Sequence, residues 1–462
     1  MKLLFVVHYF LPRHQAGTEI YTASLARAFK NRGHEVMIFT TEDGTPAGGR
    51  FEPIADEWEG IPVHRLLTSG PADFERTYLD PELDELFAGF LAERRPDIIH
   101  FQHAFRLSTG MIEKAQTSGA GVMVTLADYW FICPPLLLLQ PGFQLCPGPE
   151  PDRCANCGNA IGTLYAGGPA GSMLHTLRDR LVRAAHAVKR KLPRGLVDRL
   201  RAWRQKKALA DPDSGLQRRK RMILDRQAAM KRALAAADLV IAPSGFMRQK
   251  MIAAGAVDPE KIVHSDYGFE EKSFSGRERK PSGHLRFGFI GTPVEHKGAH
   301  VAVAAMNRLM DTEAELIIYG DLSWFPAYAR RLRRLAKNPR VAFKGRFEHD
   351  EVADILAGLD ALIVPSLWFE NSPLTIHEAF LAGVPVIVSD IGGMAELIRE
   401  GGGQAFRTGE AEDLARVMRG LIENPDRLRE TAKSIPRVKT IEENAEELMA
   451  HYARFSRPKK SE

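Results

Sequence analysis

The sequence predicts an α/β protein of two domains, each a mostly parallel sheet with helices on both faces. Short apolar runs rich in β-branched residues alternate with amphipathic stretches of helical length, as in doubly wound sheets. A polar stretch containing Gly and Pro at 270–284 separates two such series and is the expected linker. The length of 462 residues also exceeds what one hydrophobic core usually spans.

The composition is ordinary for a globular protein, with 44% hydrophobic and 26% charged residues. No run of about 18 uncharged apolar residues occurs, so no membrane-spanning helix is expected. The apolar run at 3–7 is too short for a signal peptide and favours a buried first strand. We therefore expect a cytoplasmic protein.

The first domain is placed at 1–269 and is expected to begin with a strand, a loop, a helix and a second strand. The apolar run 2–10 precedes a polar loop at 11–18, a helical stretch and a strand at 36–40. The loop carries the single glycine Gly17 and lacks G-x-G-x-x-G, which argues against a hydride-transferring enzyme. Further strands are expected at 97–101, 121–126, 238–244 and 261–264.

Polar residues follow two of these strands. His100 and His103 lie at the end of the strand at 97–101, and Asp128 follows the strand at 121–126. The carboxyl ends of parallel strands commonly line a binding cleft, so these residues are candidates for binding an acceptor hydroxyl or for catalysis. The alternative is that the histidines are structural and that Asp128 caps a turn.

The four cysteines of the chain fall within the segment 133–157. Disulfides are disfavoured in a cytoplasmic protein, whereas a closing C-x2-C pair with two upstream thiols is typical of a metal site. We predict a structural zinc ion, with an iron–sulfur cluster as the alternative; four thiolates would fill the coordination shell and leave no position for catalysis. The predicted ligands are Cys133, Cys146, Cys154 and Cys157.

A basic insert is predicted at 167–232. Its part from 178 to 232 holds 19 Lys and Arg against five Asp and Glu, while the whole chain has a formal charge of only +5. Apolar residues including Trp203 accompany the charge, which suits an anionic membrane surface contacted through 172–232. The alternative is a solvated basic face packed on the first domain. Nucleic acid is not an expected partner, because no aromatic-rich binding platform is present.

The second domain is placed at 285–430, and a tail with one helix at 441–455 follows at 431–462. Its first strand is followed by a loop from Gly291 to Gly298 that contains Lys297. The expected strands are 285–290, 316–319, 341–343, 361–365 and 386–389, and the expected helices include 351–359 and 411–422.

The segment 369–393 carries two carboxylates, Glu370 and Glu378, on either side of a predicted helix start. Ser372 is the expected N-cap and Pro373 the first residue of a helix that runs over 374–382. A helix N-terminus offers unpaired N–H groups and the positive end of a dipole, which together suit a phosphate. If a sugar diphosphate bound there, one carboxylate could reach the sugar and the other the ribose.

This segment resembles the E-x7-E motif of the retaining glycosyltransferases of family 4, which have the GT-B fold of two Rossmann-like domains facing a cleft. The resemblance implies a nucleotide diphosphate sugar donor on the second domain and an acceptor on the first. It also implies retention of configuration, no catalytic metal, and a C-terminal helix that crosses back to the first domain. The acceptor would be a glycan, a lipid-linked molecule or another hydroxyl compound, in cell-surface or extracellular polysaccharide synthesis.

The resemblance also assigns residues. The implied catalytic residues are Glu370, Lys297 and Asp128. The implied donor-binding residues are Gly17, Gly291, Thr292, Lys297, Arg346, Phe347, Glu370, Asn371, Ser372, Pro373, Leu374 and Glu378. Two positions depart from the family pattern, because Ala127 stands where a histidine is usual and Thr292 where an arginine is usual. Lys297 is then the cation expected to neutralise the diphosphate, with Arg346 as a substitute for the second.

Two alternatives exist, of which the first, a GT-A enzyme, is rejected by the position of its motif, and the second remains. A GT-A enzyme would need a D-x-D motif at a strand end, and the notable match, 211–213, lies inside the basic insert. A catalytically weak or inactive GT-B scaffold, acting as a membrane-associated binding protein, is favoured by Ala127 and Thr292. Turnover of a nucleotide sugar distinguishes an enzyme from such a scaffold.

Overall fold

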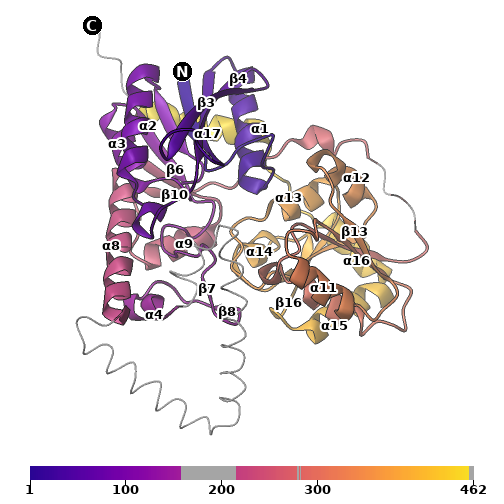
Figure 1. Ribbon diagram of the computed structural model, residues 1–462. Helices are drawn as coiled ribbons and strands as arrows, with labels where there is room; N and C mark the ends of the chain where they lie inside the picture. The colour runs from indigo at the N-terminus through magenta and orange to yellow at the C-terminus, as the bar shows by residue number, and fades with distance from the viewer. Residues whose placement is uncertain (158–214, 278–279, 281, 457–462) are drawn as a thin grey trace.

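The computed structural model describes residues 1–157, 215–277, 280 and 282–456. Two domains lie side by side, each containing one large sheet flanked by helices (Figure 1). The boundary between the domains lies between β10 (Ile262–His264), the last strand of the first large sheet, and β11 (Arg286–Ile290), the first strand of the second. Both large sheets are almost entirely parallel, as the buried apolar runs of the sequence predict.

The first sheet has β1 near its middle. In spatial order its strands are β10, β9 (Leu239–Ala242), β6 (Gly121–Thr125), β5 (Ile98–Phe101), β1 (Lys2–Val6), β2 (Glu35–Asp43), β4 (Ile61–Thr68) and β3 (Phe51–Trp58). Only β3 is antiparallel to its neighbour. Because β1, β5 and β6 are adjacent and parallel, the residues that follow them meet at one edge of the sheet.

Helices cover both faces of this sheet. One face packs on α2 (Pro81–Arg94), α3 (Thr109–Thr117), α8 (Gly215–Ala236) and α9 (Gly245–Ala253), and the other on α1 (Gly17–Asn31) and α17 (Ile441–Phe455). The short elements β7 (Leu139–Gln140), β8 (Gln144–Leu145) and α4 (Pro151–Asn156) follow β6. A single helical turn, Glu75–Thr77, precedes α2.

The second sheet has the order β13 (Val341–Gly345), β12 (Glu315–Tyr319), β11, β14 (Ala361–Val364), β15 (Val386–Ser389) and β16 (Gly403–Phe406). Its helices are α10 (Ala299–Met306), α11 (Pro326–Leu335), α12 (Val352–Ala357), α13 (Leu374–Leu381), α14 (Gly392–Leu397), α15 (Ala411–Glu423) and α16 (Pro425–Lys433). Short 3₁₀ turns lie at Glu271–Ser273, Glu295–Lys297 and His349–Glu351. Two buried apolar clusters, one on each face of the sheet, form the core of this domain.

The C-terminal helix α17 packs on the first domain although it follows the second (Figure 1). Thr440 and Glu443 form a capping box at its start. Near its end, the Tyr452 hydroxyl lies 2.6 Å from His100 Nδ1, and His100 Nε2 lies 2.8 Å from Thr125 Oγ1. His100 is therefore a buried structural histidine that ties α17 to the first sheet, and it does not face the cleft.

The basic insert predicted at 167–232 extends too far toward the C-terminus. Residues 215–232 belong to α8, whose Ile223 and Met230 are buried in the core of the first domain. Arg226 is buried on this helix, and its guanidinium donates a hydrogen bond to the backbone oxygen of Trp130. The rest of the insert lies outside the described residues, as does the 211–213 D-x-D sequence, so membrane contact through 172–232 stays a prediction. In the described part of the chain, no helix is long and apolar enough to cross a membrane.

The predicted zinc or iron–sulfur site is not formed. Cys133, Cys146, Cys154 and Cys157 are all described, yet no three or more His, Cys, Asp or Glu side chains among the described residues are grouped to hold a metal ion. Cys146 Sγ donates to the backbone oxygen of Gly148 at 3.3 Å. Burial raises the pKa of Cys133 to about 12. The metal prediction is therefore wrong for these residues.

Candidate functional site

Glu370 is the centre of a compact polar cluster in the second domain. Its Oε1 accepts hydrogen bonds from Lys297 Nζ at 2.6 Å, Ser366 Oγ at 2.7 Å and Trp368 Nε1 at 2.8 Å. Glu370 is buried, whereas the Lys297 side chain is one-third exposed. The Lys297 ammonium also lies 5.5 Å from the Trp368 ring centroid. The cluster therefore holds one lysine in a fixed direction at the edge of the sheet.

The helix after Glu370 begins where the sequence predicts, but its cap differs from the prediction. α13 starts at Leu374 with Pro373 as its N-cap residue, so Ser372 is not the N-cap. Ser372 Oγ donates to Asp266 Oδ1 at 2.7 Å and lies 2.8 Å from His377 Nε2. Because the Ser372 hydroxyl bonds to Asp266 and does not cap the helix, the N–H groups of the first turn of α13 have no side-chain cap.

Two glycines allow the backbone around Glu370 to approach other segments. Gly298 has φ +72°, and a Cβ there would lie 1.8 Å from the backbone oxygen of Pro365. A Cβ on Gly393 would lie 1.5 Å from the backbone oxygen of Asn371, while its N–H donates to the Glu370 oxygen at 2.9 Å. The loops that carry Lys297 and Glu370 can therefore take these positions only with glycine at both places.

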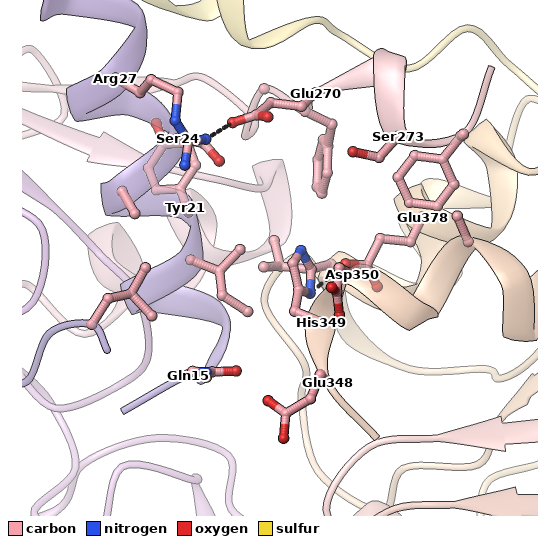
Figure 2. Close-up of a pocket in the computed structure, with 18 of the residues that line it drawn as sticks. Gln15, Tyr21, Ser24, Arg27, Glu270, Ser273, Glu348, His349, Asp350 and Glu378 are labelled. Atoms are coloured by element: carbon pink, nitrogen blue, oxygen red, sulfur yellow. Dashed lines mark hydrogen bonds and ion pairs between the residues drawn. The ribbon is translucent and has the colours of Figure 1, made fainter. Parts of the chain in front are cut away.

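Glu378 lines a cavity of about 500 Å³ between the two domains (Figure 2). This volume lies within the range of small-molecule sites, roughly 300–1,000 Å³. His349 Nδ1 lies 3.8 Å from Glu378 Oε1, and Glu348 and Asp350 lie on the same wall. Burial raises the pKa of Glu378 to about 7, and burial lowers the pKa of His349, so the pair gains little from charge attraction. Glu378 is thus a buried carboxyl that a hydroxyl-rich ligand can reach.

The opposite wall of the cavity comes from α1 and the linker (Figure 2). Tyr21, Ser24 and Arg27 face the cavity from α1. Arg27 Nη1 donates to Glu270 Oε1 at 2.5 Å, and its other guanidinium nitrogens donate to both Glu59 oxygens at 2.8 Å. No local sequence feature selects these residues, because their role depends on how α1 is placed against the second domain.

The two domains contact each other beside Glu370. Asn371 Nδ2 donates to the backbone oxygen of Leu126 at 2.7 Å, and Ser244 Oγ donates to Asn371 Oδ1 at 2.9 Å. The carboxylate of Glu396 accepts from the backbone N–H groups of Gly245 and Phe246 at 2.8 and 2.7 Å, at the N-terminus of α9. Asn371, predicted to bind the donor, is used in the structure to join the domains.

The remaining predicted residues lie around the same site. Gly17 begins α1 opposite α13, where an added Cβ would lie 3.0 Å from Leu374 Cδ1. Gly291 follows β11 with φ +134°, and Thr292 next to it is exposed. Arg346 is exposed and pairs with Glu348 at 2.8 Å, and the Phe347 ring lies 6.5 Å from Tyr319. Arg346 therefore flanks the cavity without entering the Lys297–Glu370 cluster.

Asp128 follows β6 at the domain contact. Its Oδ1 accepts from the backbone N–H of Trp130 at 2.8 Å, so it caps a turn. Its Oδ2 lies 3.0 Å from His103 Nε2. The pKa of Tyr129 is raised by burial and, to a smaller extent, by the carboxylates of Glu370 and Asp128. Both carboxylates therefore lie near the Tyr129 side chain. The structure thus brings Asp128 to the Glu370 side of the first domain.

Family comparison agrees with this arrangement. The family described as "Glycosyl transferases group 1" matches residues 270–438, and the "Glycosyl transferase 4-like domain" matches residues 16–188. Sulfoquinovosyl transferase SQD2 of Arabidopsis thaliana is 28% identical over 200 residues, which cover 40% of this chain and 38% of that protein. D-inositol 3-phosphate glycosyltransferase 1 of Catenulispora acidiphila is 22% identical over 437 residues, 89% of this chain and 84% of its own. The chain therefore spans less than half the length of some of the curated relatives it matches.

Among solved structures, Anabaena HepE in complex with UDP and glucose is similar with a TM-score of 0.62 and 17% identity, over 98% of this chain and 99% of that one. Two parallel-sheet domains that enclose the Lys297–Glu370 cluster and the cavity define a protein of the GT-B class. The chain belongs to family 4, group 1, of the glycosyltransferases. The family predicted from the E-x7-E segment is confirmed.

Proposed function

We propose that this chain transfers a hexosyl group, with retention of configuration, from a nucleotide diphosphate sugar to a hydroxyl acceptor. The Lys297–Glu370 cluster beside the Glu378 cavity carries the proposal. A diphosphate placed between them meets the Lys297 ammonium and the uncapped N–H groups of α13, and both stabilise the negative charge of the leaving group. The nucleoside then extends toward Glu378. The acceptor we propose is a glycan or a lipid-linked hydroxyl compound of polysaccharide synthesis.

The donor is tested by incubating the purified protein with a panel of nucleotide sugars and detecting the released nucleotide and the transferred or hydrolysed sugar by mass spectrometry. UDP-glucose is the first probe, because the similar HepE structures hold UDP, glucose and UDP-glucose. Turnover of one donor above the Glu370→Gln variant supports the proposal. Nucleotide binding without turnover of any donor would favour the scaffold alternative. That alternative is suggested by Ala127 and Thr292, which depart from the family pattern.

Nucleotide affinity should depend on the protonation of Glu378. Two ribose hydroxyls donate better to a carboxylate than to a neutral acid, so binding favours the ionised form. With a pKa of about 7 before binding, Glu378 is protonated at pH 6 and ionised at pH 8. We expect UDP affinity by calorimetry to rise with pH, by up to about tenfold per unit below pH 7.

The matched control is Glu378→Gln, which should bind UDP more weakly at pH 8 and lose this part of the pH dependence. Titration of UDP itself contributes equally to both proteins. The folded pKa of Glu378 lies above the ordinary value of 4.5, so its ionisation lowers stability as pH rises through 4.5 to 7. Glu378→Gln should therefore unfold at a higher temperature than the parent at pH 8. Equal pH slopes of UDP affinity in the two proteins would contradict the ribose role.

A further inference from the structure

Four polar side chains form a row at the edge of the first sheet where β1, β5 and β6 end. His8 follows β1, and its Nε2 lies 3.5 Å from Oε1 of Glu19 in the first turn of α1. His8 Nδ1 lies 3.0 Å from Nδ1 of His103, which follows β5. His103 Nε2 lies 3.0 Å from Oδ2 of Asp128, which follows β6. The order is Glu19, His8, His103, Asp128, which we call the histidine row.

The row leads from the interior to the domain contact. The side chains of Glu19, His8, His103 and Asp128 are 2%, 13%, 9% and 16% exposed, so the row is mostly buried and Asp128 is its most exposed member. Asp128 lies two residues after Leu126, whose backbone oxygen accepts the hydrogen bond from Asn371 of the second domain. Ala127 between them presents no polar group. Asp128 is therefore the end of the row that lies beside the domain contact.

The contact between the two histidines restricts where protons can lie. One hydrogen at most occupies the space between the two Nδ1 atoms, so one ring donates and the other accepts. If Glu19 is protonated, it donates to His8 Nε2, His8 Nδ1–H donates to His103, and His103 Nε2–H faces the Asp128 carboxylate. If Glu19 is ionised, His8 Nε2–H donates to Glu19, His103 Nδ1–H donates to His8, and the third proton lies on Asp128 and faces the unprotonated His103 Nε2. The two arrangements carry the same charge and differ only in the direction of the row.

Burial favours the first arrangement. It raises the pKa of Glu19, which the Glu19 and Ala16 backbone N–H groups and the nearby His103 and His14 only partly oppose. Burial also lowers the pKa of His8 well below its ordinary value, an effect increased by His103, Arg106 and His14. Both shifts favour the arrangement in which Glu19 donates and His8 directs its Nδ1–H toward His103. Arg226 and the rings of Tyr129 and Tyr267 are the other titratable groups near Asp128.

The row has hydrogen-bonding capacity left over at its outer end. His103 Nε2 is within 3.0 Å of Asp128 but is not aligned with it, so this buried nitrogen has no hydrogen-bond partner. Asp128 Oδ1 already accepts from Trp130, which fixes the carboxyl plane and leaves further lone pairs unused. A buried donor without a partner is unfavourable, so a ligand oxygen that accepts from it is favoured.

We propose that Glu19 and His8 set the tautomer of His103 so that its Nε2–H donates to an oxygen of the sugar acceptor, while Asp128, held by the Trp130 N–H, accepts a hydrogen bond from the attacking hydroxyl of the same molecule. The inference rests on the proposed transferase function and names the acceptor side of that site. Glu19 and His8 are positioning residues, whereas Asp128 and His103 contact the acceptor. No side chain at position 127 is needed in this arrangement.

The direction of the row is measured by NMR of the full chain with ¹⁵N-labelled histidine rings. We expect His8 to carry its proton on Nδ1 and His103 on Nε2. In Asp128→Asn, the side-chain amide donates to His103 Nε2, so both tautomers should reverse, including that of His8, which does not contact residue 128. His100, buried and bonded to Tyr452 and Thr125, is the control whose ring signals should stay unchanged. A His8 tautomer that is unaffected by Asp128→Asn overturns the row.

The acceptor role is measured with two variants of similar size. His103→Gln places an amide N–H near the position of Nε2, whereas His103→Asn reaches only the position of Nδ1. With UDP-glucose and a panel of octyl glycosides, we expect His103→Asn to lower transfer by about 10- to 100-fold with UDP affinity unchanged, and His103→Gln to retain most transfer. Equal losses in both variants overturn the acceptor role. Tautomers as expected with no turnover of any donor by the parent protein would reject the transferase function and leave the row itself intact.

Discussion

Lys297→Met should lower kcat/KM for sugar transfer by about 10²- to 10³-fold, as expected when one preorganised group that stabilises a leaving anion is removed. Methionine keeps the length and apolar character of the side chain, so the change isolates the charge. The ammonium is held 2.6 Å from Glu370 and cannot be replaced locally, because Thr292 is uncharged and Arg346 pairs with Glu348 at the exposed rim. Steady-state kinetics with the donor found in the screen, and calorimetry with UDP, measure the effect.

Two control variants separate catalysis from stability. Arg346→Met should change kcat/KM by less than about fivefold, since its partner Glu348 lies outside the cluster. Lys297→Met alone leaves Glu370 buried with only Ser366 and Trp368 as donors, which should lower the unfolding temperature. Adding Glu370→Gln should restore much of the stability and none of the activity. If the double variant recovered activity, or Arg346→Met were as damaging, Lys297 would not be the cation at the diphosphate.

Much of the fold could be predicted because apolar runs of strand length are buried on both faces. The strand at 386–389 and the helix at 441–455 have the bounds of β15 and α17. The hairpin of β3 and β4 was missed, since β3 alternates partly buried and exposed residues at the sheet edge and lacks a continuous apolar run. α8 was assigned to the basic insert because nothing local reveals that Arg226 would be buried against Trp130, 96 positions earlier in the chain.

The site divides in the same way. Glu370, Glu378 and Lys297 could be selected because a helix start, a spacing and a family pattern are local features. The other half of the cavity could not, because Tyr21 and Arg27 look like any other residues of α1 until the second domain is placed against them. The cysteines show the opposite error: close spacing along the chain suggested a metal site, but Cys133 packs in the core and Cys146 bonds to Gly148. Close spacing of cysteines along the chain is therefore a weak guide to a metal site.

Gly393→Ala should lower the free energy of unfolding by about 2–3 kcal/mol and abolish most transfer activity, although it adds only a methyl group. The new Cβ would lie 1.5 Å from the Asn371 oxygen and 3.1 Å from the Glu370 oxygen, and both neighbours are backbone atoms that cannot rotate away. The Glu370–Asn371 backbone must therefore move. That movement would draw Glu370 from Lys297 and Asn371 from Leu126 at once, so cluster and domain contact are lost together. Thermal unfolding and kinetics of one preparation measure both effects.

The matched control for this prediction is Gly89→Ala, because Gly89 is an exposed residue of α2 with no atom within 4 Å of an added Cβ. Alanine in a helix interior is favoured over glycine by about 1 kcal/mol, so this variant should be slightly more stable and fully active. The comparison tests whether Gly393 is required because no space exists there for a side chain. A Gly393→Ala protein as stable and active as Gly89→Ala would show that the loop carrying Glu370 tolerates displacement. Glu370 and Asn371 are consecutive, so a displacement caused at Gly393 affects the donor site and the domain contact together. A shift too small to unfold the protein should still weaken both.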